Sequence, residues 1–110
     1  MAGRLSRGEI RLVQFPAPDK QRPVLILTRN SSLGLLGTAT VAPITSTIRG
    51  VPSEVVLDVN DGMKNRCVVN LHNVATVSQE RIGKRVASLS AARMGEVCRA
   101  LGYSLGCGDV

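Results

Sequence analysis

The sequence predicts a small all-β protein, an antiparallel barrel or sandwich, with one helix near its C-terminus. Short β-type segments bounded by turn residues recur about every dozen residues between positions 9 and 77, too closely for crossover helices. Beyond residue 90 the apolar spacing changes to that of a helix. The chain has 110 residues, 44% of them hydrophobic, which suits one folded domain.

The first predicted strand covers residues 9–14. Pro16 and Pro18 follow it and make residues 15–21 a loop, because proline is excluded from a central strand. Residues 23–28 form a nearly continuous apolar run, typical of a strand that is covered on both faces. A connection over 30–37 comes next. Its leucines either cover a barrel end or lie in a partner interface: Leu33, Leu35 and Leu36.

The third predicted strand covers residues 38–44, and Pro43 predicts an edge or a bulge near its end. A polar loop over 45–50 follows. Three more strands are predicted, the first two separated by the turn signal Asn60-Asp61-Gly62. They cover residues 53–59, 66–71 and 73–77.

The predicted helix has Ser90 at its N-cap and Gly102 just past its end. We therefore expect one domain over residues 1–102, including a helix near 90–102. Residues 103–110 are rich in glycine and are expected to form a flexible tail.

The net charge is +6, and eleven of the fourteen basic residues are arginine. The guanidinium group suits phosphate, so the composition favours an anionic partner such as nucleic acid. No apolar run approaches the roughly 20 residues of a membrane span, and the N-terminus has no apolar stretch typical of a secretory signal. We expect a cytoplasmic protein without membrane contact.

Several kinds of chemistry have no support in the sequence. Phosphate-binding loops of the G-x-x-x-x-G-K-[ST] or G-x-G-x-x-G type are absent, and so is a G-x-S-x-G motif. A single histidine and three widely spaced cysteines favour neither a zinc site nor a disulfide framework: Cys67, Cys98 and Cys107. We predict no metal and no cofactor.

Two polar stretches at strand ends are the candidates for a functional site. In Gln21-Arg22-Pro23 the proline disfavours helical geometry in the preceding residue, so Arg22 is expected to be extended. The second stretch is Pro43-Ile44-Thr45-Ser46-Thr47, at the end of the third strand. An arginine fork and hydroxyl donors at neighbouring strand ends can hold one phosphate together. The alternative is a surface arginine and an ordinary Ser/Thr turn.

Five segments, in order along the chain, resemble the MazF/PemK (Kid) family of toxin endoribonucleases. The resemblance covers residues 7–101, nearly the whole chain. Its segments are Arg7-Gly8-Glu9-Ile10, Arg22-Pro23-Val24-Leu25-Ile26-Leu27, Val41-Ala42-Pro43-Ile44-Thr45-Ser46, Pro52-Ser53-Glu54-Val55-Val56-Leu57 and Cys67-Val68-Val69-Asn70-Leu71.

The resemblance implies an SH3-like barrel, a homodimer, and metal-independent, sequence-specific cleavage of single-stranded mRNA. The implied products carry a 2′,3′-cyclic phosphate and a 5′-hydroxyl. It also implies an antitoxin partner whose acidic, extended tail occupies the RNA groove.

The family's functional arginine maps onto Arg22 and its threonine onto Thr45. Arg22 is better suited to stabilise charge than to act as a general acid, because a guanidinium rarely gives up its proton. The base is open. The first loop is shorter than in many relatives, and Asp19 is its only carboxylate. Further along, His72-Asn73-Val74-Ala75 replaces a family Asp-Gln-x-Arg segment. His72 is a candidate because imidazole titrates near neutrality, or it binds a nucleotide or packs at the dimer seam.

Further RNA-binding candidates come from the same polar stretches and from the end of the strand at 66–71. The only aromatic residues are Phe15 and Tyr103, so phosphate contacts should outweigh base stacking. Two alternatives stay open, a gyrase inhibitor of the CcdB type and a non-catalytic RNA-binding module. The further candidates are Ser46, Lys20, Gln21, Thr47, Arg49 and Asn70.

Overall fold

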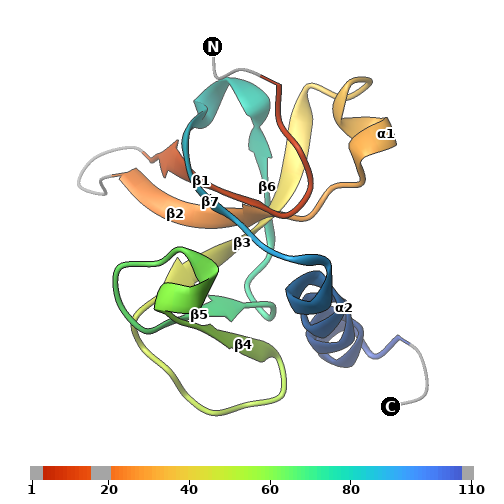
Figure 1. The fold of residues 1–110 in the computed structure, drawn as a ribbon. Coiled ribbons are helices and arrows are strands. Elements are labelled where there is room, and N and C mark those ends of the chain that lie inside the picture. Colours follow the sequence, from red (N-terminus) through yellow and green to blue (C-terminus); the bar gives the residue numbers. More distant parts are fainter. Residues whose placement is uncertain (1–3, 16–20, 108–110) are drawn as a thin grey trace.

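The computed structural model describes residues 4–15 and 21–107. Seven antiparallel strands and a C-terminal helix make up most of this part of the chain (Figure 1). The strands are β1 (Glu9–Gln14), β2 (Gln21–Ile26), β3 (Thr38–Thr45), β4 (Glu54–Leu57), β5 (Cys67–Asn70), β6 (Ala75–Ser78) and β7 (Ile82–Ser88). The helices are α1 (Asn30–Leu33), α2 (Ala91–Leu105) and the 3₁₀ turns η1 (Val59–Asp61) and η2 (Gln79–Arg81).

The strands form one bent sheet in the order β4-β5-β3-β2-β1-β7, and β6 pairs with β3 outside this path. The predicted all-β class with a C-terminal helix is confirmed. The barrel is not closed by hydrogen bonds, because β4 and β7 end the path and do not pair with each other in the described residues.

Strand β3 has three neighbours, and Pro43 lies between the end of the pairing with one of them and the start of the pairing with the next. Along one edge β3 pairs with β6 over residues 38–41 and then with β5 from Ile44 onward. On the other edge it pairs with β2. Strand β3 is therefore not an edge strand, so of the predicted edge or bulge the edge is wrong, and pairing on one side of the strand is interrupted at Pro43. A proline without an N–H is tolerated here because it lies in the gap between the β6 and β5 pairings.

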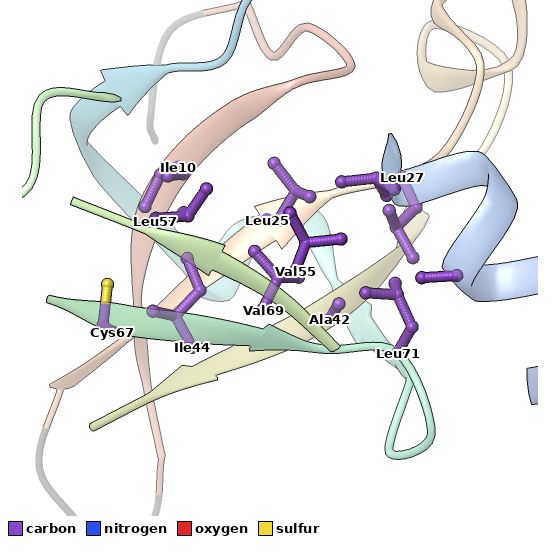
Figure 2. Packing of buried hydrophobic residues seen from close by; sticks show 12 residues of the cluster. Ile10, Leu25, Leu27, Ala42, Ile44, Val55, Leu57, Cys67, Val69 and Leu71 are labelled. Carbon is purple, nitrogen blue, oxygen red and sulfur yellow. The ribbon is translucent and has the colours of Figure 1, made fainter. Parts of the chain in front are cut away.

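The sheet buries aliphatic side chains on both of its faces. Strand β2 contributes the Leu25 side chain to one core, followed directly by Leu27, and contributes Val24 and Ile26 to the other, which confirms a strand covered on both faces. Figure 2 shows core 1 from close by. Core 1 comprises Ile10, Leu25, Leu27, Ala42, Ile44, Val55, Leu57, Cys67, Val69, Leu71, Val97 and Ala100. Core 2 comprises Leu5, Val13, Val24, Ile26, Leu33, Ala39, Val41 and Ile82.

Helix α2 begins as predicted, with the Ser90 side chain accepting a hydrogen bond from the Arg93 N–H. It continues through Gly102 to Leu105, so the predicted helix end and the start of the flexible tail are both wrong. The left-handed residue that ends the helix is Gly106, at φ 72°. In the part of the chain that the structure describes, helices are too short or too polar to cross a bilayer.

Two elements differ from the sequence prediction. Strand β7 was not predicted, because Lys84, Arg85 and Val86 are exposed at the sheet edge and mask the alternation. Helix α1 is a single turn within the predicted connection 30–37. Its Leu33 lies in core 2, so this leucine covers the core. Leu35 and Leu36 are exposed, and for them the alternative of a partner interface stays open.

Candidate functional site

The two predicted catalytic residues lie at adjoining strand ends. Arg22 is the second residue of β2 and is exposed, and Thr45 is the last residue of β3. The β2–β3 pairs end at Val24 with Pro43. The same register extended by two residues aligns Arg22 with Thr45, and both strand ends lie on one side of the molecule (Figure 1). Directly opposed residues in antiparallel strands have Cβ atoms about 5 Å apart.

The alternation of the two strands gives both side chains the same face of the sheet. Val24 and Val41 both belong to core 2. Side chains two residues apart in a strand share a face. Arg22 is therefore on the same face as Val24, and Thr45 is on the same face as Val41 and Pro43. Core 2 does not extend to these last positions, and the Arg22 side chain is accessible to solvent as a result.

The Thr45 hydroxyl shapes the turn that follows β3. Its Oγ1 accepts a hydrogen bond from the Thr47 N–H at 3.2 Å. Accepting this bond uses an oxygen lone pair, so the same hydroxyl can still donate its hydrogen to a phosphate oxygen. Ser46 and Thr47 are exposed beside it. The turn thus offers hydroxyl donors next to the position that register gives to Arg22.

The loop continues to Arg49 and Gly50, whose backbone N–H groups donate to the Glu54 carboxylate at the start of β4. The Arg49 side chain is exposed. Gly50 has a φ of 75°, in the left-handed region that glycine adopts most easily. An acidic side chain therefore fixes the shape of the loop and leaves its basic side chain accessible.

His72 lies at the other end of β5. Thr45 pairs with Val68, and β5 continues away from Thr45 to Asn70 before the turn that carries His72. Its Nδ1 atom is 2.6 Å from the Ser53 Oγ. Within one chain the structure does not bring His72 together with Arg22 and Thr45.

The other predicted site residues are dispersed. Asn70 is 8% exposed, and its Oδ1 accepts a hydrogen bond from the His72 N–H, so little of its surface is left for a nucleotide. Gln21 is exposed and pairs with Gln14 of β1. Asp19 and Lys20 lie outside the described residues.

Sequence reasoning missed two exposed basic residues at this end of the sheet, Lys64 and Arg66. The β3–β5 register, extended two residues beyond Thr45 and Val68, aligns Thr47 with Arg66. The signal was a pair of basic residues directly after the turn Asn60-Asp61-Gly62. Arg66 precedes β5 at the end of the strand that pairs with Thr45 and adds positive charge there.

Cys67 lies between this basic segment and Val68 but is not suited to act as a nucleophile. Burial raises the pKa of the Cys67 thiol, and the Asp61 carboxylate raises it further. A raised pKa keeps the sulfur protonated at neutral pH, and the thiolate is the reactive form. Cys67, Cys98 and Cys107 are all free thiols.

A different polar cluster anchors helix α2. The Arg93 guanidinium donates hydrogen bonds to both Asp61 oxygens, at 2.9 and 3.0 Å, and a further nitrogen contacts Glu96. The hydrogen bonds from Arg93 hold the pKa of Asp61 below its ordinary value of 3.8. The same bonds raise the pKa of Arg93. This cluster is internally paired and joins α2 to η1.

Comparison with known proteins gives concordant results. In sequence, the chain is 38% identical over 104 residues to the probable endoribonuclease MazF2 of Mycobacterium tuberculosis, covering 94% of this chain and 100% of that relative. The probable endoribonuclease MazF5 of the same organism is 39% identical over 103 residues, covering 93% and 94%.

Solved structures agree with the sequence comparison. The Mycobacterium tuberculosis toxin MazF-mt6 superposes with a TM-score of 0.83 at 35% identity, covering 92% of this chain and 99% of that one. A MazE-MazF structure from Deinococcus radiodurans gives 0.82 at 27% identity, covering 96% and 99%. The model of the PemK-like, MazF-like toxins of type II toxin-antitoxin systems matches residues 6–105. With the two strand ends that carry Arg22 and Thr45, these matches show that the chain belongs to the PemK-like, MazF-like toxin family.

Proposed function

We propose that this protein is a toxin endoribonuclease that cleaves single-stranded mRNA at specific short sequences without a metal. The observation that carries the proposal is the β2–β3 register, which aligns Arg22 with Thr45 when extended past Val24 and Pro43. Relatives at 37–39% identity are named as endoribonucleases, which supports the same activity here.

In the proposed reaction the ribose 2′-OH attacks the adjacent phosphorus. The new P–O bond closes a 2′,3′-cyclic phosphate, and the bond to the 5′ oxygen breaks. The proton lost by the 2′-OH goes to a base, and the leaving 5′ oxygen gains a proton to become a hydroxyl. Negative charge gathers on the non-bridging oxygens during the attack, and this charge is what the protein must stabilise.

Arg22 and Thr45 are the donors for those oxygens. The guanidinium offers a planar pair of N–H groups that matches two phosphate oxygens, and it keeps its charge throughout the reaction. The Thr45 hydroxyl adds a third donor while its lone pair stays bound to the Thr47 N–H. Preorganised donors of this kind commonly contribute a few kcal/mol each to the transition state.

Two side chains are candidates for the general base. Asp19 comes three residues before Arg22 in the sequence, which favours it for a proton transfer near that residue. His72 has its Nδ1 held by Ser53, so Nε2 is the nitrogen left for RNA. The separation of His72 from Thr45 along β5 favours nucleotide binding over proton transfer within one chain.

The remaining candidates form a phosphate-binding surface around the cleavage site. Gln21, Ser46, Thr47 and Arg49 are exposed, and the chain has few aromatic residues, which favours contacts to phosphate and base edges over stacking. Such binding should weaken as salt rises from about 50 to 200 mM, because binding releases counterions from the RNA and this release is less favourable at higher salt. The proposed surface comprises Gln21, Ser46, Thr47 and Arg49. Lys20 is included from its place in the sequence, and Asn70 is too buried to take part.

We further propose a homodimer that is neutralised by a cognate antitoxin with an acidic, extended tail, in the cytoplasm of a bacterium. The match to the toxins of type II toxin-antitoxin systems supports an antitoxin partner. The Deinococcus radiodurans relative, solved in a MazE-MazF structure, supports it too. An acidic tail complements the net charge of +6.

The test is incubation of the purified protein with a long single-stranded RNA in the presence of a chelator. Discrete fragments that end in a 2′,3′-cyclic phosphate are expected. Intact RNA would instead identify a non-catalytic RNA-binding module. Inhibition of DNA supercoiling with intact RNA would identify a gyrase inhibitor.

A further inference from the structure

The segment Pro52-Ser53-Glu54 connects two parts of the site but has no role in the cleavage step. Glu54 is the first residue of β4 and is half-buried. Its Oε1 accepts hydrogen bonds from the Arg49 N–H at 3.1 Å and from the Gly50 N–H at 2.9 Å, and its Oε2 is 3.3 Å from the Arg49 nitrogen. The carboxylate therefore binds two consecutive backbone N–H groups.

This arrangement depends on the backbone of Gly50. Two successive N–H groups converge on one anion when a residue in the left-handed region follows an ordinary one. Gly50 has a φ of 75°. The carboxylate and the left-handed glycine thus stabilise the same loop shape from two directions.

The loop held by Glu54 begins beside the proposed reacting phosphate and runs to the start of β4, where Glu54 pairs with Asn70. It begins at Thr45, whose hydroxyl already fixes the Thr47 N–H. With Arg49 and Gly50 bound to Glu54, the loop is fixed at both ends. The exposed Thr47 and Arg49 side chains lie between or at these fixed points.

Ser53 fixes the second group of candidate residues. Its Oγ is 2.6 Å from the His72 Nδ1, and its carbonyl accepts a hydrogen bond from the Leu71 N–H at 2.9 Å. Adjacent residues at the start of β4 therefore hold the 45–50 loop on one side and the His72 turn on the other.

We propose that Glu54 is a positioning residue for substrate RNA, holding the far end of the 45–50 loop so that Thr47 and Arg49 contact nucleotides that flank the scissile phosphate. The inference rests on the proposed endoribonuclease function. Glu54 does not touch the reacting atoms. Its loss should therefore weaken RNA binding and relax sequence selection more than it slows the chemical step.

The first test compares Glu54→Ala with Glu54→Gln on an RNA that the unmodified protein cleaves. Glu54→Ala removes the acceptor and should raise KM about tenfold while kcat changes less than about threefold. Glu54→Gln keeps an Oε1 acceptor for both N–H groups and should stay within about twofold of the unmodified protein. Cleavage mapping on a long RNA should show additional cut sites only for Glu54→Ala.

A second pair of variants perturbs the same loop without touching Glu54. Gly50→Ala places a methyl group in open space but strains the left-handed backbone, so it should raise KM as Glu54→Ala does. Gly34→Ala is the matched control. Gly34 also has open space around it and has a φ of −76°, which alanine adopts readily, so KM should not change.

Three results would overturn the proposal. One is an unchanged KM in both Glu54→Ala and Gly50→Ala. Another is tighter RNA binding in both Glu54 variants, which would mean that the carboxylate only repels the substrate. The third is a folded unmodified protein that shows no RNA binding by fluorescence anisotropy with a 2′-O-methyl oligonucleotide. If the unmodified protein binds RNA but does not cleave it, the proposed function fails, and the anisotropy of the four variants still decides the role of Glu54.

Discussion

Arginine is used in different ways in the 45–50 loop, which begins at the sheet end around Arg22 and Thr45, and at the anchor of helix α2. At the anchor, Arg93 donates to both oxygens of Asp61, whose side chain is only 8% exposed. In the 45–50 loop, the Glu54 carboxylate binds backbone N–H groups, and the Arg49 side chain stays exposed. The comparison teaches that pairing, rather than arginine content, distinguishes a structural cluster from a surface suited to an anionic ligand.

The largest expected effect at the sheet end is that of Arg22→Ala. We expect cleavage of single-stranded RNA to fall roughly 100- to 1,000-fold, because a charged donor to the transition state is lost. The melting temperature should change little, since Arg22 is exposed. The control is Arg99→Ala on α2, an exposed arginine outside this end of the sheet. Cleavage at the normal rate by Arg22→Ala would refute the assignment of the site.

Thr45→Val is expected to have the next largest effect. Valine keeps the shape of threonine but removes the hydroxyl, so the variant should cleave roughly 30-fold more slowly through loss of a hydrogen bond to a charged phosphate, about 2 kcal/mol. Thr45→Ser should recover most of the rate. Initial rates at saturating RNA measure both, and equal rates for valine and threonine would exclude the hydroxyl from the reaction.

The anchor should respond in the opposite way. Arg93→Met removes the partner of Asp61 and should lower the free energy of unfolding by about 1.5 kcal/mol, discounted from the cost of a fully buried pair because the Arg93 side chain is 27% exposed. Cleavage at a temperature where the variant is folded should not change. Urea denaturation measures the first quantity. A loss of cleavage in the folded variant would contradict the separation of the two regions.

The smallest expected effect is on the pH dependence of stability. The pKa of Asp61 is lowered in the folded state, so its contribution is fully present above its ordinary value of 3.8 and is lost as the pH falls through the lower, folded value. The difference in stability between the unmodified protein and Asp61→Asn should therefore narrow as the pH drops below about 4. A constant difference between pH 6 and pH 3 would show that the charge of Asp61 is not what stabilises the anchor.

The sequence allowed most of the fold to be predicted, for identifiable reasons. Turn residues and prolines bounded β1 and β3 to within a residue, and Ser90 marked the start of α2. Strand β7 was missed because its exposed Lys84 and Arg85 interrupt the apolar alternation. The extension of α2 past Gly102 was missed because the sequence alone does not distinguish a glycine inside a helix from a glycine that ends it.

The candidate site was less accessible to sequence reasoning, because it depends on strand register. Arg22 and Thr45 could be selected by motif, but their alignment follows from the pairing of Val24 with Pro43. The β3–β5 register separates His72 from Thr45, and it aligns Arg66 with Thr47 when it is extended past the two strand ends. The role of Glu54 could not be predicted either, since its partners are backbone atoms of residues four and five positions earlier in the chain.

The central position of β3 has a consequence for how activity is lost. This strand is held by β2 on one edge and by β6 and then β5 on the other, and it ends at Thr45. Detaching β3 requires three neighbours to release it, so its amide hydrogens should be among the last to exchange with solvent. The protein would then have no partially unfolded state that lacks the site, and heat or denaturant would abolish catalysis only when the whole domain unfolds.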